Sequence, residues 1–161
     1  MENSYREMIT KIRNLKAKDI PTQEITKIRN DANFRTILST ILNEENHFLA
    51  VIDYKDKHVG FITLLNILEI FKPEHTKIQS VLTRKHTMSD ITAKNIAETH
   101  LPFIYDNDTL EHIAELMLKY GMQFLPRASD KKDSSYKGII RLKDIFKTSL
   151  EFMAQYSKSK G

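Results

Sequence analysis

Two short stretches place similar residues at the same spacing before a predicted helix. Thr63 precedes Asn66 in "GFITLLN", and Arg141 precedes Asp144 in "GIIRLKD". A hydroxyl or a guanidinium at a helix start can hold phosphate oxygens, helped by the free backbone N–H groups and the helix dipole. A carboxylate three residues later lies on the same helix face and can accept ribose hydroxyls. All four residues are therefore candidate nucleotide contacts.

Each stretch lacks either the hydroxyl or the carboxylate. The first keeps the hydroxyl of Thr63 but has no carboxylate, and Asn66 could still accept from one ribose hydroxyl. The second keeps Asp144 but has Arg141 in place of the hydroxyl, and a guanidinium can fork onto a phosphate. The alternative for the Arg141–Asp144 pair is a surface ion pair worth about 0.3 kcal/mol. The alternative for Asn66 is a solvated or capping residue.

Other kinds of chemistry have no support in the sequence. The chain has no cysteine, so disulfides, thiolate nucleophiles and Cys-based zinc sites are excluded. Six histidines show no metal-ligand spacing on one helix face and are expected to be single surface residues. In "DNDTLE", Asp108 is expected to cap a helix, with Glu111 completing a capping box. No phosphate-binding glycine loop or nucleophile–base set occurs, so neither an enzyme nor a metal site is expected.

The totals are those of an ordinary globular protein. The 161 residues are 40% hydrophobic and 29% charged, with a net charge of +4. The positive charge favours anionic partners, but it is scattered, so nucleic acid is not an expected partner. The apolar stretch over 61–71 is too short to cross a bilayer, and the first residues lack the apolar core of a secretory signal. We therefore expect a cytoplasmic protein without a membrane segment.

A repeat of about 76 residues organises the chain. A shift of 76 aligns "AKDI" at 17–20 with "AKNI" at 93–96, and "FL" at 48–49 with "FL" at 124–125. After a hairpin the shift becomes 78, and Gly60 then aligns with Gly138. Such a register across a whole unit indicates duplication. It also places Arg127, beside Pro126, opposite Val51 in a predicted strand. Arg127 could reach a phosphate from there, or it could extend its stem over apolar surface at a sheet edge.

Each repeat has the pattern β-α-β-β-α. A short extended piece around Ile28 or Ile104 precedes an amphipathic helix, whose apolar stripe in the first repeat is Phe34, Ile37, Leu38, Ile41 and Leu42. A strand, a polar turn and a second strand follow, and the repeat ends in another helix. One copy would leave a sheet face bare. We therefore expect an α/β fold in which two repeats pack sheet to sheet with pseudo-two-fold symmetry, with flanking helices.

The expected segments follow from this register. Residues 1–15 form an N-terminal amphipathic helix, and residues 16–73 form the first repeat. Residues 74–91 form a linker with a helical turn through Ile78, Val81 and Leu82. Residues 92–150 form the second repeat, and residues 151–161 form the end of the last helix, to about Tyr156, and a tail.

The repeat resembles the cystathionine-beta-synthase-type (CBS) domain, which usually occurs as a tandem pair. The resemblance lies in the order and spacing of "KDIPTQEITKI", "DANF" and "GFITLLN" in the first copy, and of "KNIAETHLPFI", "DNDTLEHIAELMLKYGMQFLP" and "GIIRLKD" in the second. Together these cover nearly all of the chain apart from its ends and the linker. The resemblance implies a non-catalytic regulatory module in which adenosine compounds bind in clefts between the paired units, and which commonly dimerises.

The resemblance also implies candidates in the opening segment of each repeat, which begins with "AKDI" at 17–20 in the first and with "AKNI" at 93–96 in the second. Thr22 holds the family's threonine position in the first repeat, and Ile96 lies in the corresponding segment of the second. Glu98 takes the threonine position there, and its carboxylate would repel phosphate. A site that uses Glu98 would accept a less charged ligand or stay empty. The candidate contacts are thus Thr22, Thr63, Asn66, Ile96, Arg127, Arg141 and Asp144.

Two functions remain open at this point. The first is a sensor that binds AMP, ADP, ATP or a related adenosyl ligand and signals to an unknown partner protein, with a terminal helix as the moving part. The second is a ligand-free module that acts through its dimer surface. The second is favoured by the division of the motif, since threonine is kept in one copy and aspartate in the other. A homodimer is expected in both cases, and no cofactor is required in either.

Overall fold

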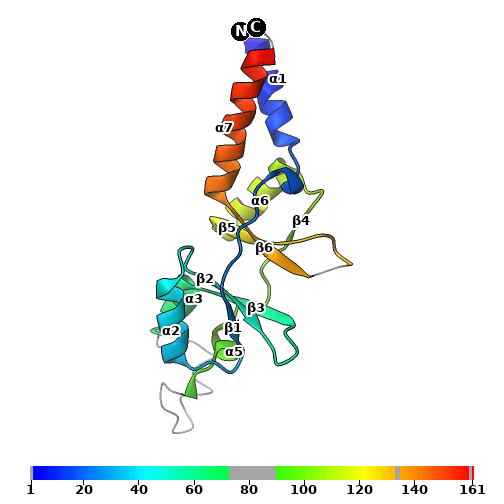
Figure 1. The fold of residues 1–161 in the computed structure, drawn as a ribbon. Coiled ribbons are helices and arrows are strands. Elements are labelled where there is room, and N and C mark those ends of the chain that lie inside the picture. Colours follow the sequence, from blue (N-terminus) through cyan, green and yellow to red (C-terminus); the bar gives the residue numbers. More distant parts are fainter. Residues whose placement is uncertain (1, 73–89, 133–134, 160) are drawn as a thin grey trace. The chain divides into compact units, whose positions relative to one another are not determined.

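The computed structural model describes residues 2–72, 90–132, 135–159 and 161. The chain divides into two compact units, unit 1 with Met1–Glu24 and Pro102–Gly161, and unit 2 with Ile25–Leu101. Each unit contains one three-stranded sheet with helices packed on it (Figure 1). The predicted α/β class and the doubled β-α-β-β-α order are confirmed. The helical turn expected in the linker lies outside the described residues.

Unit 2 contains the first repeat apart from its opening segment. Its elements are β1 (Lys27–Arg29), α2 (Phe34–Asn43), β2 (Phe48–Ile52), β3 (His58–Thr63), α3 (Leu64–Glu69) and α5 (Ala93–Ile96). The sheet has the order β1-β2-β3, with β1 parallel and β3 antiparallel to β2. The α5 turn comes from the second repeat.

Unit 1 has the same layout with the second repeat. Its elements are α1 (Glu2–Arg13), the 3-10 turn η1 (Ala17–Asp19), β4 (Ile104–Tyr105), α6 (Leu110–Tyr120), β5 (Phe124–Ala128), β6 (Tyr136–Arg141) and α7 (Leu142–Ser159). The sheet order is β4-β5-β6, again with one parallel and one antiparallel pair. The central strands agree with the aligned repeat, because Val51 pairs with Ile28 and Gly60 while Arg127 pairs with Ile104 and Gly138.

The apolar faces of the helices cover the sheets, although less broadly than predicted. Phe34, Ile37 and Ile41 of α2 are buried in the core of unit 2. Leu42 was expected on the same stripe but is 63% exposed. Each residue turns the helix by about 100°, so Leu42 points well away from the face that carries Ile41. The buried stripe therefore ends one residue earlier than predicted.

The terminal helices of unit 1 lie side by side (Figure 1). Ile12 of α1 is buried, and the ammonium of Lys11 lies 4.8 Å from the ring centre of Tyr156 on α7. The last helix does continue past the repeat, to Ser159. Tyr5 of α1 is 63% exposed. It lies two helical turns before Ile12, near the free end of the helix.

The predicted cap of α6 was displaced by one residue. The cap is Thr109, whose side chain accepts from the backbone N–H of His112 at 3.2 Å. Asp108 instead accepts from the backbone N–H of Tyr105 at 2.8 Å and closes the turn after β4. That bond occupies Asp108, so the extended residue after it begins the helix. Glu111 therefore does not complete a capping box.

Candidate functional site

Each unit takes its opening segment from the other repeat. In unit 1, the backbone of Gln23 donates to Ile139 on β6 and accepts from it, both at 2.9 Å. In unit 2, Glu98 and Phe61 on β3 exchange the same pair of bonds, at 2.7 and 2.9 Å. The opening segments are thus exchanged between the repeats. The boundaries of the repeats in the sequence do not coincide with those of the compact units.

Gly138 makes this docking possible in unit 1. Its φ is +138°, a backbone conformation that residues with a side chain rarely adopt. A Cβ at this position would lie 2.4 Å from the carbonyl oxygen of Gln23 and 2.7 Å from Cγ2 of Thr22. Gly60 allows a looser approach in unit 2, because a Cβ there would lie 3.0 Å from the carbonyl oxygen of Glu98. Both glycines that the repeat aligns therefore admit an opening segment.

The predicted alignment of Glu98 with Thr22 was wrong by one residue. Since Gln23 pairs with β6 as Glu98 pairs with β3, the place of Thr22 belongs to Ala97, whose Cβ faces Gly60. The N–H of Ala97 donates to the carbonyl of Ala93 and closes an α-helical turn. The shift of 76 aligns Pro21 with Ala97. Pro21 has no N–H for such a bond, so the chain leaves η1 in an extended form. Glu98 is therefore not at the threonine position.

The exchange brings together groups that the sequence separates. Thr22 and the Arg141–Asp144 pair both lie in unit 1, where Thr22 precedes the residue that pairs with Ile139 of β6 and Arg141 ends that strand. Thr63 and Asn66 lie in unit 2, where Ala97 offers no hydroxyl. Unit 1 therefore combines the threonine of the opening segment, Thr22, with the aspartate of the second motif, Asp144, whereas unit 2 has Thr63 without a matching aspartate.

Arg141 and Asp144 form a two-pronged ion pair at the start of α7. Nε of Arg141 donates to Oδ2 of Asp144 at 2.7 Å, and Nη2 donates to Oδ1 at 3.1 Å. The side chains are only 16% and 7% exposed. The alternative of an ion pair is thus realised, but the pair is largely buried rather than on the surface. A buried pair of this geometry is stronger than an exposed one.

Thr63 and Asn66 form a capping box at the start of α3. The hydroxyl and the backbone N–H of Thr63 donate to Oδ1 of Asn66 at 2.9 and 2.8 Å, and the N–H of Asn66 lies 3.2 Å from Oγ1 of Thr63. Thr92 and Asn95 repeat the first two bonds before α5, both at 2.9 Å. The capping alternative for Asn66 is therefore realised, and its amide oxygen is already engaged.

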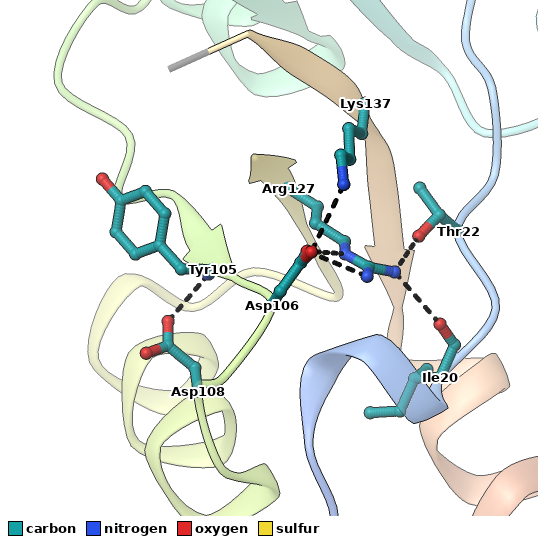
Figure 2. Close-up of polar contacts among 7 residues, drawn as sticks. All are labelled: Ile20, Thr22, Tyr105, Asp106, Asp108, Arg127 and Lys137. Carbon is teal, nitrogen blue, oxygen red and sulfur yellow. Dashed lines mark hydrogen bonds and ion pairs between the residues drawn. The ribbon is translucent and has the colours of Figure 1, made fainter. Parts of the chain in front are cut away.

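Arg127 lies at the centre of a polar cluster in unit 1 (Figure 2). It sits on the central strand, not at an edge, and is 9% exposed. Its Nε and Nη2 donate to Oδ1 of Asp106 at 3.1 and 2.9 Å. Its Nη1 donates to Oγ1 of Thr22 at 2.5 Å and to the carbonyl of Ile20 at 3.4 Å. The guanidinium thus joins β5 to the opening segment.

Asp106 holds this cluster together. Nζ of Lys137 on β6 lies 3.3 Å from its Oδ2, and its backbone carbonyl accepts from the N–H of Lys18 at 3.0 Å. Burial raises the pKa of Asp106. Hydrogen bonds from Arg127 and Lys137 and the positive charges of both lower it, and together they outweigh burial, so the pKa of Asp106 lies below its ordinary value. Asp106 is therefore a carboxylate near neutral pH.

Comparison with known families identifies this arrangement. The family model described as "CBS domain" matches residues 17–73 and 93–151, which is more than half of the chain. The chain belongs to the CBS domain family. The resemblance stated from the sequence is thereby confirmed, and each of its two repeats is a CBS domain. Proteins with such pairs are generally regulatory and non-catalytic.

Solved CBS proteins share the fold. The CBS domain of a CBS-domain-containing membrane protein from Sphaerobacter thermophilus is 21% identical, with a TM-score of 0.64 over 91% of this chain and 95% of that one. CbpB from Streptococcus agalactiae is 20% identical, with a TM-score of 0.59 over 98% and 92%. CBSX2 in complex with AMP is 15% identical, with a TM-score of 0.61 over 88% and 95%. No curated protein matches the chain.

Ile96 and Glu98, in the opening segment of the second CBS domain, both make contacts within unit 2. Ile96 is 6% exposed and packs in the core of unit 2. The side chain of Glu98 accepts from the backbone N–H of His100 at 2.8 Å. Asp106 and Lys137 were not among the candidates. The signal for Asp106 was Arg127 itself, because a charged residue in a predicted strand requires a buried partner of opposite charge.

The histidines give no metal site in the part of the chain that is described. No group of three or more metal-ligating side chains occurs among those residues. His58 is not a surface residue as expected, because it is half-buried and its ring centre lies 4.2 Å from that of Phe61. Burial and the charge of Lys27 lower the pKa of His58 to about 4. None of the described helices is long and apolar enough to cross a membrane.

Proposed function

We propose that this CBS pair is a non-catalytic regulatory protein that binds an adenosine-containing nucleotide through unit 1 and reports its occupancy to a partner protein. The observation that carries the proposal is the exchange of opening segments. It places Thr22 in the same compact unit as Arg141 and Asp144, although the two motifs belong to different repeats. The AMP complex of the structural neighbour CBSX2 supports the choice of an adenosine ligand.

The Arg141–Asp144 pair suits an exchange of partners. Ribose hydroxyls would donate to the carboxylate of Asp144, and the guanidinium of Arg141 would turn from that carboxylate to a phosphate. Each charge keeps a partner throughout, so neither is left buried and unpaired. The exchange takes place in the first turn of α7, whose far end carries Tyr156 beside α1. The terminal helices are therefore the proposed route to the partner protein.

Calorimetry with AMP, ADP, ATP, S-adenosylmethionine and cyclic di-AMP tests this function. A ligand at 100 times its dissociation constant adds about 2.7 kcal/mol of stability, which raises the melting temperature. Asp144→Ala is expected to weaken binding at least tenfold, because a hydrogen bond to a charged group contributes about 1.5–3 kcal/mol. The control is Asn66→Ala at the aligned position of unit 2, which should leave the affinity unchanged. Absence of heat and of a melting shift at millimolar ligand would overturn the proposal.

A ligand-free interaction module is the second candidate. It is favoured because the candidate groups already bond to one another, as Thr63 does with Asn66 and Arg141 with Asp144. Large apolar side chains are also exposed at aligned positions of both repeats, since Leu68 is 60% exposed and Phe146 is 64% exposed. An exposed apolar side chain at the same place in each repeat suits contact with a second copy of the chain, and we propose a homodimer to which α3 and α7 each contribute.

A further inference from the structure

The hydrogen bonds of Arg127 leave it little capacity for a ligand. A guanidinium has about five N–H donors, fixed in one plane. Four hydrogen bonds use the three nitrogens of Arg127, two to Asp106, one to Thr22 and one to the carbonyl of Ile20. The residue is 9% exposed and its charge is matched by Asp106. Arg127 is therefore occupied in holding protein groups.

The bond to Thr22 determines what the hydroxyl of Thr22 can do. Oγ1 accepts from Nη1 of Arg127, so its own proton must point elsewhere (Figure 2). Among the residues that the structure describes, none accepts that proton. A hydroxyl has one donor and two acceptor positions, and Arg127 takes one of the acceptor positions. Thr22 is thereby left as a hydrogen-bond donor for a group outside the described protein.

The aligned positions of unit 2 have no such arrangement. In the two units, Val51 corresponds to Arg127, Asn30 to Asp106 and Ala97 to Thr22. None of the three can form the chain of charged and hydroxyl groups found in unit 1. The arrangement is thus a property of one unit and not of the repeated fold.

We infer that Arg127 is a positioning residue, which holds the hydroxyl of Thr22 as a donor toward a hydrogen-bond acceptor of the bound nucleotide. This inference rests on the proposed function. In this role Arg127 does not itself reach a phosphate, because its hydrogen bonds go to protein groups. The acceptor is a phosphate oxygen or a nitrogen or oxygen of the nucleoside, and binding of adenosine compared with AMP separates these sources.

A double-mutant cycle tests the inference on the full chain. Thr22→Val and Arg127→Met should each weaken AMP binding about three- to tenfold, the effect of one hydrogen bond. The double variant should lose no more than the stronger single variant, because both changes remove the same bond. Additive losses would overturn the inference. Thr22→Ser, which keeps the hydroxyl, should bind within about twofold of the wild type.

Arg127→Lys separates positioning from charge. A lysine keeps the charge beside Asp106 but cannot reproduce the four bonds of the guanidinium, so this variant should bind as weakly as Arg127→Met. Recovery of the wild-type affinity for AMP by lysine, with no effect on adenosine, would assign the residue to the phosphate and overturn the inference. The matched control is Arg29→Met, because Arg29 forms a more exposed ion pair with Asp56 in unit 2.

Amide hydrogen exchange without ligand distinguishes the failure of this inference from that of the proposed function. Arg127→Met should speed the exchange of the Gln23 and Ile139 amides at least tenfold, because the opening segment loses its side-chain anchor. Unchanged exchange would overturn the positioning role even if the wild-type protein binds AMP. Faster exchange in a protein that binds none of the nucleotides would overturn the proposed function and the ligand role of Thr22, but not the anchor.

Discussion

Gln23 and Ile139 donate to each other's carbonyl oxygen at 2.9 Å, which fastens the opening segment of the first CBS domain to a strand of the second. Neither residue has a side chain that suggests this contact. The pair nevertheless decides which polar groups share a unit, because Thr22 precedes Gln23 and Arg141 follows Ile139.

The glycine beneath this contact should be sensitive to a single methyl group. Gly138→Ala combines a φ of +138° with a Cβ 2.4 Å from the carbonyl of Gln23, and it should destabilise the protein by about 3 kcal/mol. Gly121→Ala provides the control, since its φ is +62° with nothing within 4 Å of the added Cβ, and it should cost about 1 kcal/mol. Urea unfolding measures both. Equal losses would mean that the opening segment does not pack on Gly138.

The Asp106–Arg127 ion pair should contribute more to the free energy of unfolding than an exposed ion pair does. Asp106→Asn removes the charge that balances buried Arg127 and should cost about 2 kcal/mol of unfolding free energy. Asp56→Asn, whose pair with Arg29 has side chains that are 75% and 51% exposed, should cost about 0.3 kcal/mol. The stabilisation by Asp106 is present above its ordinary pKa and is lost as the pH falls through its lowered pKa. Similar losses in the two variants would contradict the assignment.

Mild acid should weaken the folded state through His58. Its pKa is lowered to about 4, so the unfolded chain takes up the proton first as the pH falls below about 6.5. Stability therefore decreases between about pH 6.5 and 4 and is fully present above that window. In His58→Phe, the melting temperature at pH 5 relative to pH 7.5 should fall by several degrees less than in the wild type. His112→Gln, at an exposed position, should behave as the wild type does.

The proposed homodimer should depend on the exposed apolar positions of α3 and α7. A variant with Leu68→Glu and Phe146→Glu should sediment as a monomer at concentrations where the wild type is a dimer, because buried carboxylates would oppose association. Its melting temperature at low concentration should change little, since both side chains are more than half exposed. Tyr54→Glu, 79% exposed in the β2–β3 turn, is the control. A monomeric wild type would contradict this part of the proposal.

The stability of the protein should depend on the side chains that cap the start of α3. Thr63→Ala removes the hydroxyl that bonds to Asn66 at both its oxygen and its N–H, and should cost about 1 kcal/mol. It should not alter nucleotide affinity, since these groups are engaged in the cap of α3. Calorimetry and urea unfolding measure the two effects separately. A loss of affinity would bring Thr63 back as a ligand contact.

Much of the fold was accessible from the sequence because it depends on local patterns. The helical stripe of Phe34, Ile37 and Ile41 follows from spacing, and the strands around Leu49 and Leu125 follow from short apolar runs bounded by turn residues. The duplication then predicted the matching places of Val51 and Arg127. The limits of the stripe at Leu42 and of the cap at Asp108 depended on the neighbours of each residue, so these two predictions were wrong.

The sequence by itself determined the doubled unit and its α/β class, since apolar periodicity and turn chemistry act over a few residues, and its motifs carried the resemblance to the CBS domain. Only the tertiary structure decided that Thr22 joins the unit of Asp144, and that Arg127 donates both to the hydroxyl of Thr22 and to the carboxylate of Asp106. The reason is physical. A strand edge offers the same backbone N–H and carbonyl groups to any segment, so no residue pattern records which opening segment a sheet accepts. The close packing on Gly138 and the hydrogen bonds from Arg127 to Ile20 and Thr22 select it.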